Sequence, residues 1–217
     1  MNLLRNLLTG WRTKRPRCNR RVVVLWLSGL DVARVDQLLE VGLLHYLALL
    51  SDIGVRVRVE GDAVVDFDSF VRRVRTIAPR TKALSPVPAA VPIDLDGICA
   101  ADRAQQERLF AALDRRRPQV VACEFDMVAQ LNRLFGSTPD EQQLILRDVY
   151  ARMDENVGKA FSFVDEETAL VAIIPTRRKS ADPGESPPAC ELFASVHVKA
   201  LAAGSADPVE ILRGLLN

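Results

Sequence analysis

The clearest pattern in the chain is an apolar run that ends in a turn. Residues 22–27 read Val-Val-Val-Leu-Trp-Leu, and Ser28 and Gly29 follow directly. A short continuous apolar run predicts a strand that is buried on both faces. Gly29 suits a tight turn, and Asp31 suits the N-cap of a following helix. In α/β domains such a junction, at the carboxyl end of a central strand, is where a ligand or metal normally binds.

Apolar residues spaced three and four positions apart predict helices along the rest of the chain. The first begins at Asp31 and ends before Gly42, a residue suited to the C′ position. The helix that begins at Thr138 carries a capping box, with Glu141 three residues on and Pro139 at the first helical position. The helices expected are 31–41, 44–51, 67–75, 102–117, 138–157 and 208–216.

Other segments predict strands and a loop. Residues 55–59 alternate valine with arginine, which indicates a half-exposed strand at the edge of a sheet. Four prolines between Pro79 and Pro92 predict an extended loop rather than a regular element. The remaining strands expected are 119–125, 169–174 and 192–201. Strands that alternate with helices predict an α/β fold, in which helices cover both faces of a mostly parallel central sheet.

Composition limits the classes of function. At 217 residues the chain suits one well-buried domain, expected at residues 22–217. The formal net charge of +1 gives no electrostatic reason to expect a nucleic-acid partner. The four cysteines fit no zinc or redox spacing, and Cys123, inside an apolar strand, should behave as a small hydrophobe. We therefore expect a reduced, cytoplasmic protein without a transmembrane helix.

The first 21 residues differ from the rest, because they contain seven Arg or Lys residues and no acid. Residues 2–8 are amphipathic at helical spacing, and a basic run with one tryptophan follows at 11–17. Two interpretations stay open. The segment is either a solvated tail, or an arm that lies on an anionic membrane surface or in a groove of a protein partner, with residues 1–17 making the contact.

Three segments carry a family resemblance in the same order along the chain. Residues 22–31 read Val-Val-Val-Leu-Trp-Leu-Ser-Gly-Leu-Asp. Residues 121–130 read Val-Ala-Cys-Glu-Phe-Asp-Met-Val-Ala-Gln, and a run with Tyr150, Asp154 and Gly158 follows. Residues 167–178 read Glu-Thr-Ala-Leu-Val-Ala-Ile-Ile-Pro-Thr-Arg-Arg. Together they resemble the alkaline phosphatase superfamily, and most closely its type I phosphodiesterase/nucleotide pyrophosphatase branch.

The resemblance implies that a two-metal site has lost its ligands. Such a site needs clustered Asp and His side chains around each divalent ion. The first metal-binding Asp of the family falls on Ser28, and the second falls on Asp126, which is retained. The expected His four residues later falls on Gln130. The Asp-His pair after the third strand falls on Thr176 and Arg177, where a cation would repel the metals.

The nucleophile and the histidines fit the family no better. Thr76, Thr81 and Ser85 are the hydroxyls available in the proline-rich region, and Ser85 matches best, although no adjacent base or metal would activate it. His197 falls near the late histidine of the family, but one leftover ligand cannot hold two metals. His45 falls on a position without a catalytic role, so we expect a structural or surface role for it.

These residues leave three hypotheses about function. The first is a non-catalytic member of the superfamily that binds no cofactor and serves as a structural or interaction subunit of a larger protein assembly. This protein would be cytoplasmic, and it would be peripheral to a membrane complex if the arm touches lipid. The second is a phosphohydrolase with zinc in a rearranged site built on Asp126, His197 and Asp31. The third is an anion- or nucleotide-binding module in which Arg177, Arg178 and the turn at Ser28 and Gly29 form the pocket. The alternatives without a binding role are a solvated basic loop at 176–179 and a helix-capping role for Asp126.

Overall fold

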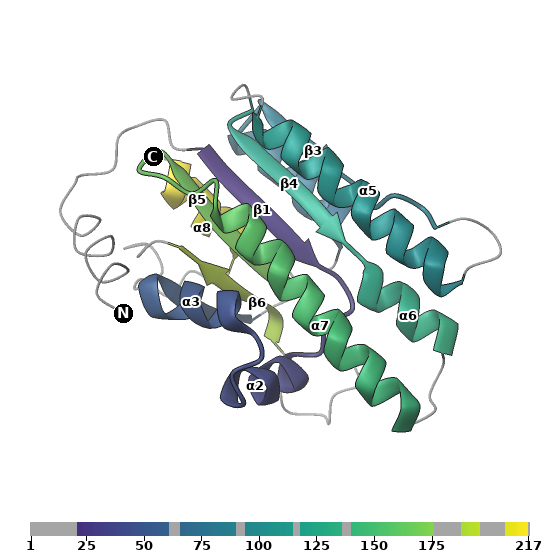
Figure 1. Ribbon diagram of the computed structural model, residues 1–217. Helices are drawn as coiled ribbons and strands as arrows, with labels where there is room; N and C mark the ends of the chain where they lie inside the picture. The colour runs from purple at the N-terminus through teal and green to yellow at the C-terminus, as the bar shows by residue number, and fades with distance from the viewer. Residues whose placement is uncertain are drawn as a thin grey trace, which may run out of the picture.

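The protein is an α/β sandwich built on one sheet (Figure 1). The computed structural model describes residues 21–60, 66–89, 94–114, 118–135, 140–175, 188–195 and 207–216. The strands are β1 (Arg21–Leu27), β2 (Val55–Glu60), β3 (Thr81–Leu84), β4 (Val120–Phe125), β5 (Thr168–Pro175) and β6 (Pro188–Ala194). The helices are α2 (Val32–Glu40), α3 (His45–Ile53), α4 (Phe67–Ile77), α5 (Leu95–Asp114), α6 (Met127–Phe135), α7 (Asp140–Phe161) and α8 (Pro208–Leu216).

The six strands lie in the order β2-β6-β5-β1-β4-β3. Strands β1, β3, β4 and β5 pair in parallel, whereas β6 runs antiparallel to both of its neighbours, β5 and β2. The predicted α/β fold with a mostly parallel sheet is therefore confirmed. The edge position predicted for the alternating segment at 55–59 is also confirmed, because β2 is the outermost strand on its side.

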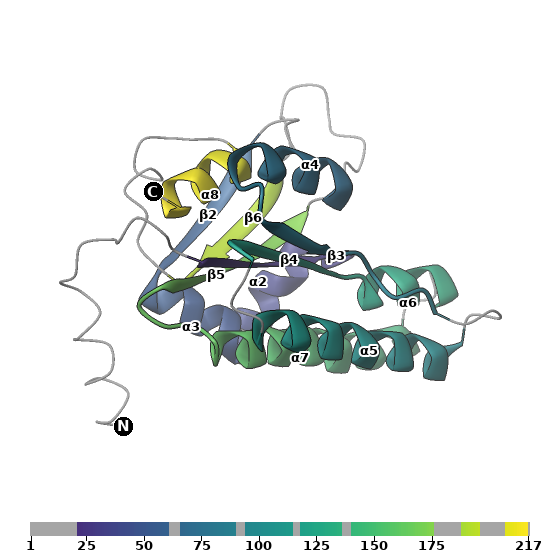
Figure 2. The same cartoon turned by 90° about the horizontal axis from the view of Figure 1, so that it is seen from above.

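Helices cover both faces of the sheet, as predicted (Figure 2). Helices α4 and α8 lie on one face, and α3, α5 and α7 lie on the other. The residues of β1 alternate between the two sides: Val22, Val24 and Trp26 belong to the cluster with α4 and α8, while the residues between them pack with α7. Each face thus receives every second side chain of a strand that is apolar throughout.

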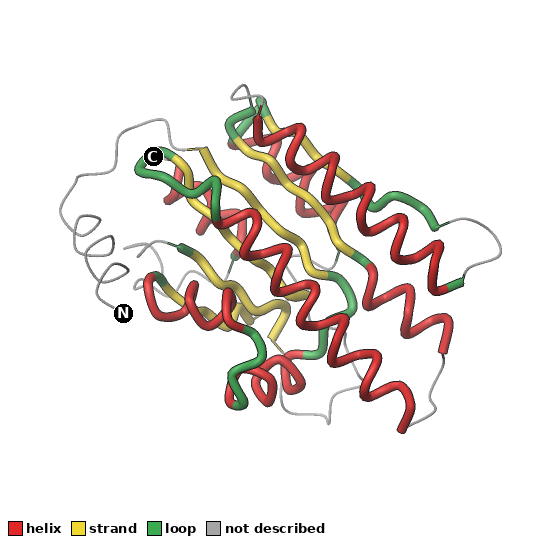
Figure 3. Tube along the Cα trace, in the orientation of Figure 1, coloured by secondary structure: helices red, strands yellow, loops and turns green. Residues whose placement is uncertain are grey.

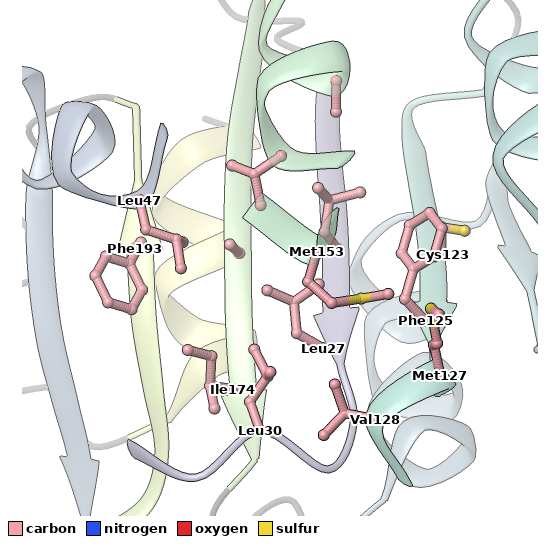
Figure 4. Close-up of a cluster of buried hydrophobic side chains, with 14 of the residues drawn as sticks. Leu27, Leu30, Leu47, Cys123, Phe125, Met127, Val128, Met153, Ile174 and Phe193 are labelled. Carbon is pink, nitrogen blue, oxygen red and sulfur yellow. The ribbon is translucent and has the colours of Figure 1, made fainter. Parts of the chain in front are cut away.

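The larger cluster lies under α7 and α3 (Figure 4). Leu27 of β1, Phe125 of β4 and Met153 of α7 are buried in it, and Phe193 of β6 packs there too. Cys123 is also fully buried in this cluster, and burial raises the pKa of its thiol to about 12. Its predicted role as a small hydrophobe is confirmed. Cys99, Cys123 and Cys190 are free thiols.

The junction after β1 forms as its residues predict. Gly29 has a φ of +87°, and a Cβ at this position would lie 2.4 Å from the backbone nitrogen of Ala129. Asp31 caps α2, because its Oδ1 accepts a hydrogen bond from the Arg34 backbone N–H at 3.0 Å. Gly42 ends that helix region with a φ of +72°. Figure 3 shows the loop between β1 and α2 and the start of α6 at the same end of the sheet.

The structure corrects four predictions. The proline-rich segment 79–92 contains strand β3 at Thr81–Leu84, because Pro79 and Pro86 flank the strand without interrupting its pairing with β4. Helix α5 begins at Leu95 rather than 102, after Asp94, whose Oδ1 accepts a hydrogen bond from the Gly97 N–H at 2.7 Å. Helix α6 was not predicted. The strand predicted at 192–201 is β6, and it ends at Ala194.

Several predictions fall on residues outside the described part. These are the arm at 1–20, the capping residues Thr138 and Pro139, and the loop at 176–187. Arg21, which was assigned to the arm, begins β1, and its guanidinium donates hydrogen bonds to the Leu113 and Ala112 carbonyls at the end of α5. Among the described residues, no helix combines the length and hydropathy that a membrane crossing requires.

Candidate functional site

The candidate site lies where the parallel strands end. Strands β1, β3, β4 and β5 run in the same direction, so the residues that follow them share one edge of the sheet. Ser28 follows β1, Ser85 follows β3, and Asp126 follows β4. This edge is the position at which open α/β sheets bind ligands. Thr176, Arg177, Arg178 and His197 lie outside the described residues.

Ser28 is held by a carboxyl group that the sequence did not suggest. Its Oγ donates a hydrogen bond to Glu124 Oε1 at 2.6 Å. Glu124 belongs to β4, where it pairs in register with Trp26 of β1. Burial raises the pKa of Glu124, and the charge of Asp126 raises it further, while the hydrogen bond from Ser28 lowers it. The Ser28 hydroxyl is therefore engaged with a buried carboxyl group whose pKa lies above its ordinary value.

Asp126 is paired with Gln130 in the same way. Gln130, one turn into α6, donates from Nε2 to Asp126 Oδ1 at 2.7 Å. Burial raises the pKa of Asp126, and the Gln130 donor opposes that shift. Gln130 is buried, and its Oε1 has no hydrogen-bond partner among the described residues. The resemblance aligns Asp126 with a metal-binding Asp and Gln130 with a metal-binding His. In this structure the two side chains are hydrogen-bonded to each other.

The amino end of α4 brings two more carboxylates to this edge. The charges of Asp68 and Asp66 both act on Glu124 and raise its pKa. Asp66 caps α4 through a hydrogen bond from the Ser69 N–H at 2.8 Å, and this bond lowers the pKa of Asp66. Phe67 fixes the helix end against the sheet, with its ring centroid 6.1 Å from that of Trp26. Sequence reasoning missed Asp66 and Asp68, whose only signal was the cap spacing of Asp66 and Ser69.

Two of the candidate nucleophiles are hydroxyls that donate to backbone carbonyls. The Thr76 hydroxyl donates to the Arg73 carbonyl at 2.7 Å, and the Thr81 hydroxyl donates to the Ala78 carbonyl at 2.5 Å. Ser85 is exposed, and its carbonyl accepts a hydrogen bond from Arg108. His45 is exposed at the start of α3. In the described part of the chain, no three His, Cys, Asp or Glu side chains are grouped as ligands for a metal ion.

The run with Tyr150, Asp154 and Gly158 serves a structural purpose. The Tyr150 hydroxyl accepts a hydrogen bond from the Asp31 backbone N–H at 2.8 Å. Asp154 accepts from the backbone N–H groups of Tyr46 and Leu47, at 3.0 and 2.8 Å, and so caps α3, whose own N-cap residue makes no side-chain bond. A Cβ on Gly158 would lie 2.4 Å from the Tyr46 ring. The three residues share one face of α7 and hold α2 and α3.

Comparison with protein-family models, curated proteins and solved structures finds no match to this chain. The resemblance to the alkaline phosphatase superfamily therefore stays a hypothesis that rests on the three sequence segments.

Proposed function

We propose that the protein is a non-catalytic α/β domain that acts as a structural or interaction subunit. The observation that supports this proposal is the pairing at the strand ends, where Ser28 binds Glu124 and Gln130 binds Asp126. Each carboxyl group is engaged by a neutral donor of the same chain. Burial also raises the pKa of both carboxyl groups, which disfavours the ionised form that a divalent metal needs.

The alternative hypothesis, a phosphohydrolase, would need a site made of side chains that are already hydrogen-bonded within the chain. Asp31 caps α2, and Asp126 accepts the hydrogen bond from Gln130. An activated nucleophile needs an adjacent base or metal, whereas the hydroxyls of Thr76 and Thr81 donate to backbone carbonyls. These contacts favour the subunit proposal over the enzyme.

Exposed apolar side chains support a contact with another protein. Val41, between α2 and α3, is 68% exposed, and Tyr46, at the start of α3, is 39% exposed. Aromatic residues and apolar anchors of this kind are enriched at the centres of protein interfaces.

The test combines an assay of chemistry with an assay of assembly. The purified, unchelated protein is analysed for zinc and manganese, and it is assayed with bis(p-nitrophenyl) phosphate in the presence of each metal. We expect no bound metal and no hydrolysis above that of Asp126→Ala. Metal at one or two ions per chain, with hydrolysis that Asp126→Ala abolishes, would overturn the proposal.

The assembly arm uses the protein in its native cells. We expect it to purify with a partner at fixed stoichiometry, and we expect Val41→Asp to release that partner. Leu134→Asp is the matched control, because Leu134 is also an exposed apolar residue, at 38%, but it lies at the end of α6. A wild-type protein that purifies as a lone monomer would count against a subunit role.

A further inference from the structure

Helix α3 is apolar on more sides than its packing on the sheet uses. Of its nine residues, only His45, Ser51 and Asp52 are polar. Its buried residues are Leu47 and Leu50. A surface helix normally carries polar residues opposite its core face, and a helix that is apolar on further sides is covered on those sides too. The remaining apolar residues of α3 therefore call for a second contact.

These residues form one stripe, Tyr46, Leu49 and Ile53, which we call the α3 stripe. Their spacing of three and four residues places them along one side of the helix. Tyr46 packs beside Gly158 of α7. Leu49 and Ile53 are partly exposed, and neither is among the described residues that pack against the two core clusters. The second half of the stripe is thus an apolar surface outside both cores.

The stripe ends at the edge of the sheet where the described chain begins. Strand β2 is antiparallel to β6, and β6 is antiparallel to β5, so β2 runs in the same direction as β5 and β1. Val55, at the start of β2, and Arg21, at the start of β1, therefore share one edge. Ile53 lies two residues before Val55. Three strand spacings separate β1 from β2, which is roughly 14 Å across the sheet.

Residues 2–8 match the α3 stripe in chemistry. They read Asn-Leu-Leu-Arg-Asn-Leu-Leu, and Leu4, Leu7 and Leu8 recur at three- and four-residue spacing. Gly10 follows, a residue suited to the end of a helix. A short segment with one apolar side is complementary to a helix that has an uncovered apolar stripe.

The connection from Arg21 to residues 2–8 is long enough to reach α3. Residues 9–20 provide twelve residues, which span at most about 40 Å when extended and roughly 20 Å on average as a flexible chain. The second value is close to the distance across the sheet with the thickness of one helix layer added. A tether is most effective when its average length matches the distance that it spans.

The charge of the connection suits its path. Residues 12–20 contain five Arg or Lys residues and no acid. They lead into Arg21, whose backbone N–H donates to the Glu167 carbonyl at 2.7 Å. The loop at 165–167 reads Asp-Glu-Glu and is exposed, and Asp52 is exposed on α3. The basic run therefore enters the sheet beside acidic residues, and α3 carries a further acid next to its stripe.

We propose that residues 2–8 bind the α3 stripe of their own chain and cover Leu49 and Ile53. Tethering gives the segment a high effective concentration, and burial of one leucine multiplies a binding constant by about ten or more. The inference goes beyond the proposed subunit function and does not rest on it. It concerns a contact within one chain, which holds whether or not another protein binds at Val41.

Hydrogen exchange of the full chain, measured by mass spectrometry, tests this contact. We expect the amides of residues 2–8 to exchange about tenfold or more slowly than in a free peptide of the same sequence. The protection should persist in about 1 M NaCl, because salt screens charge attraction but leaves an apolar contact in place. Exchange at the free-peptide rate, or protection that the salt abolishes, would overturn the proposal.

Two variants of α3 locate the contact. Leu49→Gln and Ile53→Gln should each speed exchange in residues 2–8 by about tenfold, because each removes apolar surface from the stripe. Leu134→Gln is the matched control, since Leu134 is an exposed leucine at the end of α6, and it should leave this exchange unchanged. Equal effects of the three variants, or unchanged exchange in both stripe variants, would overturn the proposal.

A reciprocal measurement changes the segment instead of the stripe. In the Leu49→Cys variant, alkylation of the introduced thiol by N-ethylmaleimide is followed on the peptide that contains it. Adding Leu7→Gln should speed this alkylation by about tenfold, because it uncovers the stripe. Asn6→Gln, on the polar side of the segment, is the control and should have no effect. An alkylation rate that Leu7→Gln does not change would overturn the proposal.

Two conditions identify what the segment binds. Protection of residues 2–8 should not depend on protein concentration, because the contact lies within one chain. Protection that falls on dilution would indicate a contact with a second copy of the chain. Protection that appears only with vesicles of phosphatidylcholine and phosphatidylserine would indicate a membrane contact. Either result would overturn the proposal.

Discussion

Asp154 should be one of the most sensitive polar positions for stability. It lies on α7 and caps α3 from a distance, with its two carboxylate oxygens each accepting one backbone N–H. The side chain is almost fully buried, at 3% exposed. Replacing Asp154 with alanine removes both acceptors and leaves the N–H groups of Tyr46 and Leu47 without a partner at the first turn of α3.

The magnitude follows from the burial of these two groups. An unsatisfied buried N–H costs about 1–3 kcal/mol, and the half-buried Tyr46 N–H should lie at the low end because water can reach it. Release of a buried charge offsets part of the loss, since burial raises the pKa of Asp154. We expect Asp154→Ala to lower the free energy of unfolding by about 2–4 kcal/mol. For a domain of this size, the midpoint should fall by about 4–16 °C.

Urea unfolding and amide hydrogen exchange test this prediction together. Asp154→Asn keeps one acceptor oxygen and should cost about half as much. Asp148→Ala is the matched control, because Asp148 is exposed on the same helix and should change stability by less than about 0.5 kcal/mol. The reasoning is wrong if Asp154→Ala costs no more than Asp148→Ala, or if exchange of the Tyr46 and Leu47 amides stays unchanged.

Three further predictions can be checked by urea unfolding. Gly29→Ala should destabilise by about 2–4 kcal/mol, because φ is +87° and the new Cβ meets the Ala129 backbone, which cannot move aside; a loss below about 1 kcal/mol would contradict the close approach. Gly158→Ala should cost about 1–2 kcal/mol because its Cβ meets the Tyr46 ring, and this cost should vanish in a Tyr46→Ala background, where an unchanged cost would exclude the ring as its cause. Burial raises the pKa of Asp102, so the stability that its protonated form contributes is present below the unfolded pKa of about 3.9 and is lost as pH rises through the folded pKa. The wild type should therefore lose stability relative to Asp102→Asn between pH 4 and pH 7, and a difference that does not vary with pH would refute this.

Local patterns were sufficient to predict most of the fold. The buried strands at 22–27, 119–125 and 169–174 are almost wholly apolar, because helices cover both faces of the sheet, and their short length favours strands over helices. Strand β3 was missed because a four-residue edge strand between Pro79 and Pro86 carries less signal than the prolines around it. Its pairing with β4 is a tertiary interaction that local propensity does not encode.

The site was less predictable, because its contacts join residues that lie far apart in the sequence. Ser28 and Asp126 follow apolar strands, so their placement at the strand ends could be expected. The Ser28–Glu124 hydrogen bond depends on the register of β1 against β4, which places Trp26 opposite Glu124. Asp102 was read as the start of a helix, whereas it lies in the second turn of α5 and is buried. Its burial follows from the packing of α5 on α7.

The pairing of β1 sets the order in which a ribosome can complete this sheet. Val22 pairs with Val120 on one side and with Ala169 on the other. Strand β1 is therefore synthesised well before β4 and β5, the two strands with which it pairs. At about 5–20 residues per second, synthesis reaches β4 on the order of ten seconds after β1, and β5 later still. During that time the apolar residues 22–27 have no native neighbour in the sheet. The nascent chain therefore exposes an apolar strand with high β-propensity until residues 120–175 have been made, and that interval is when it is most open to aggregation.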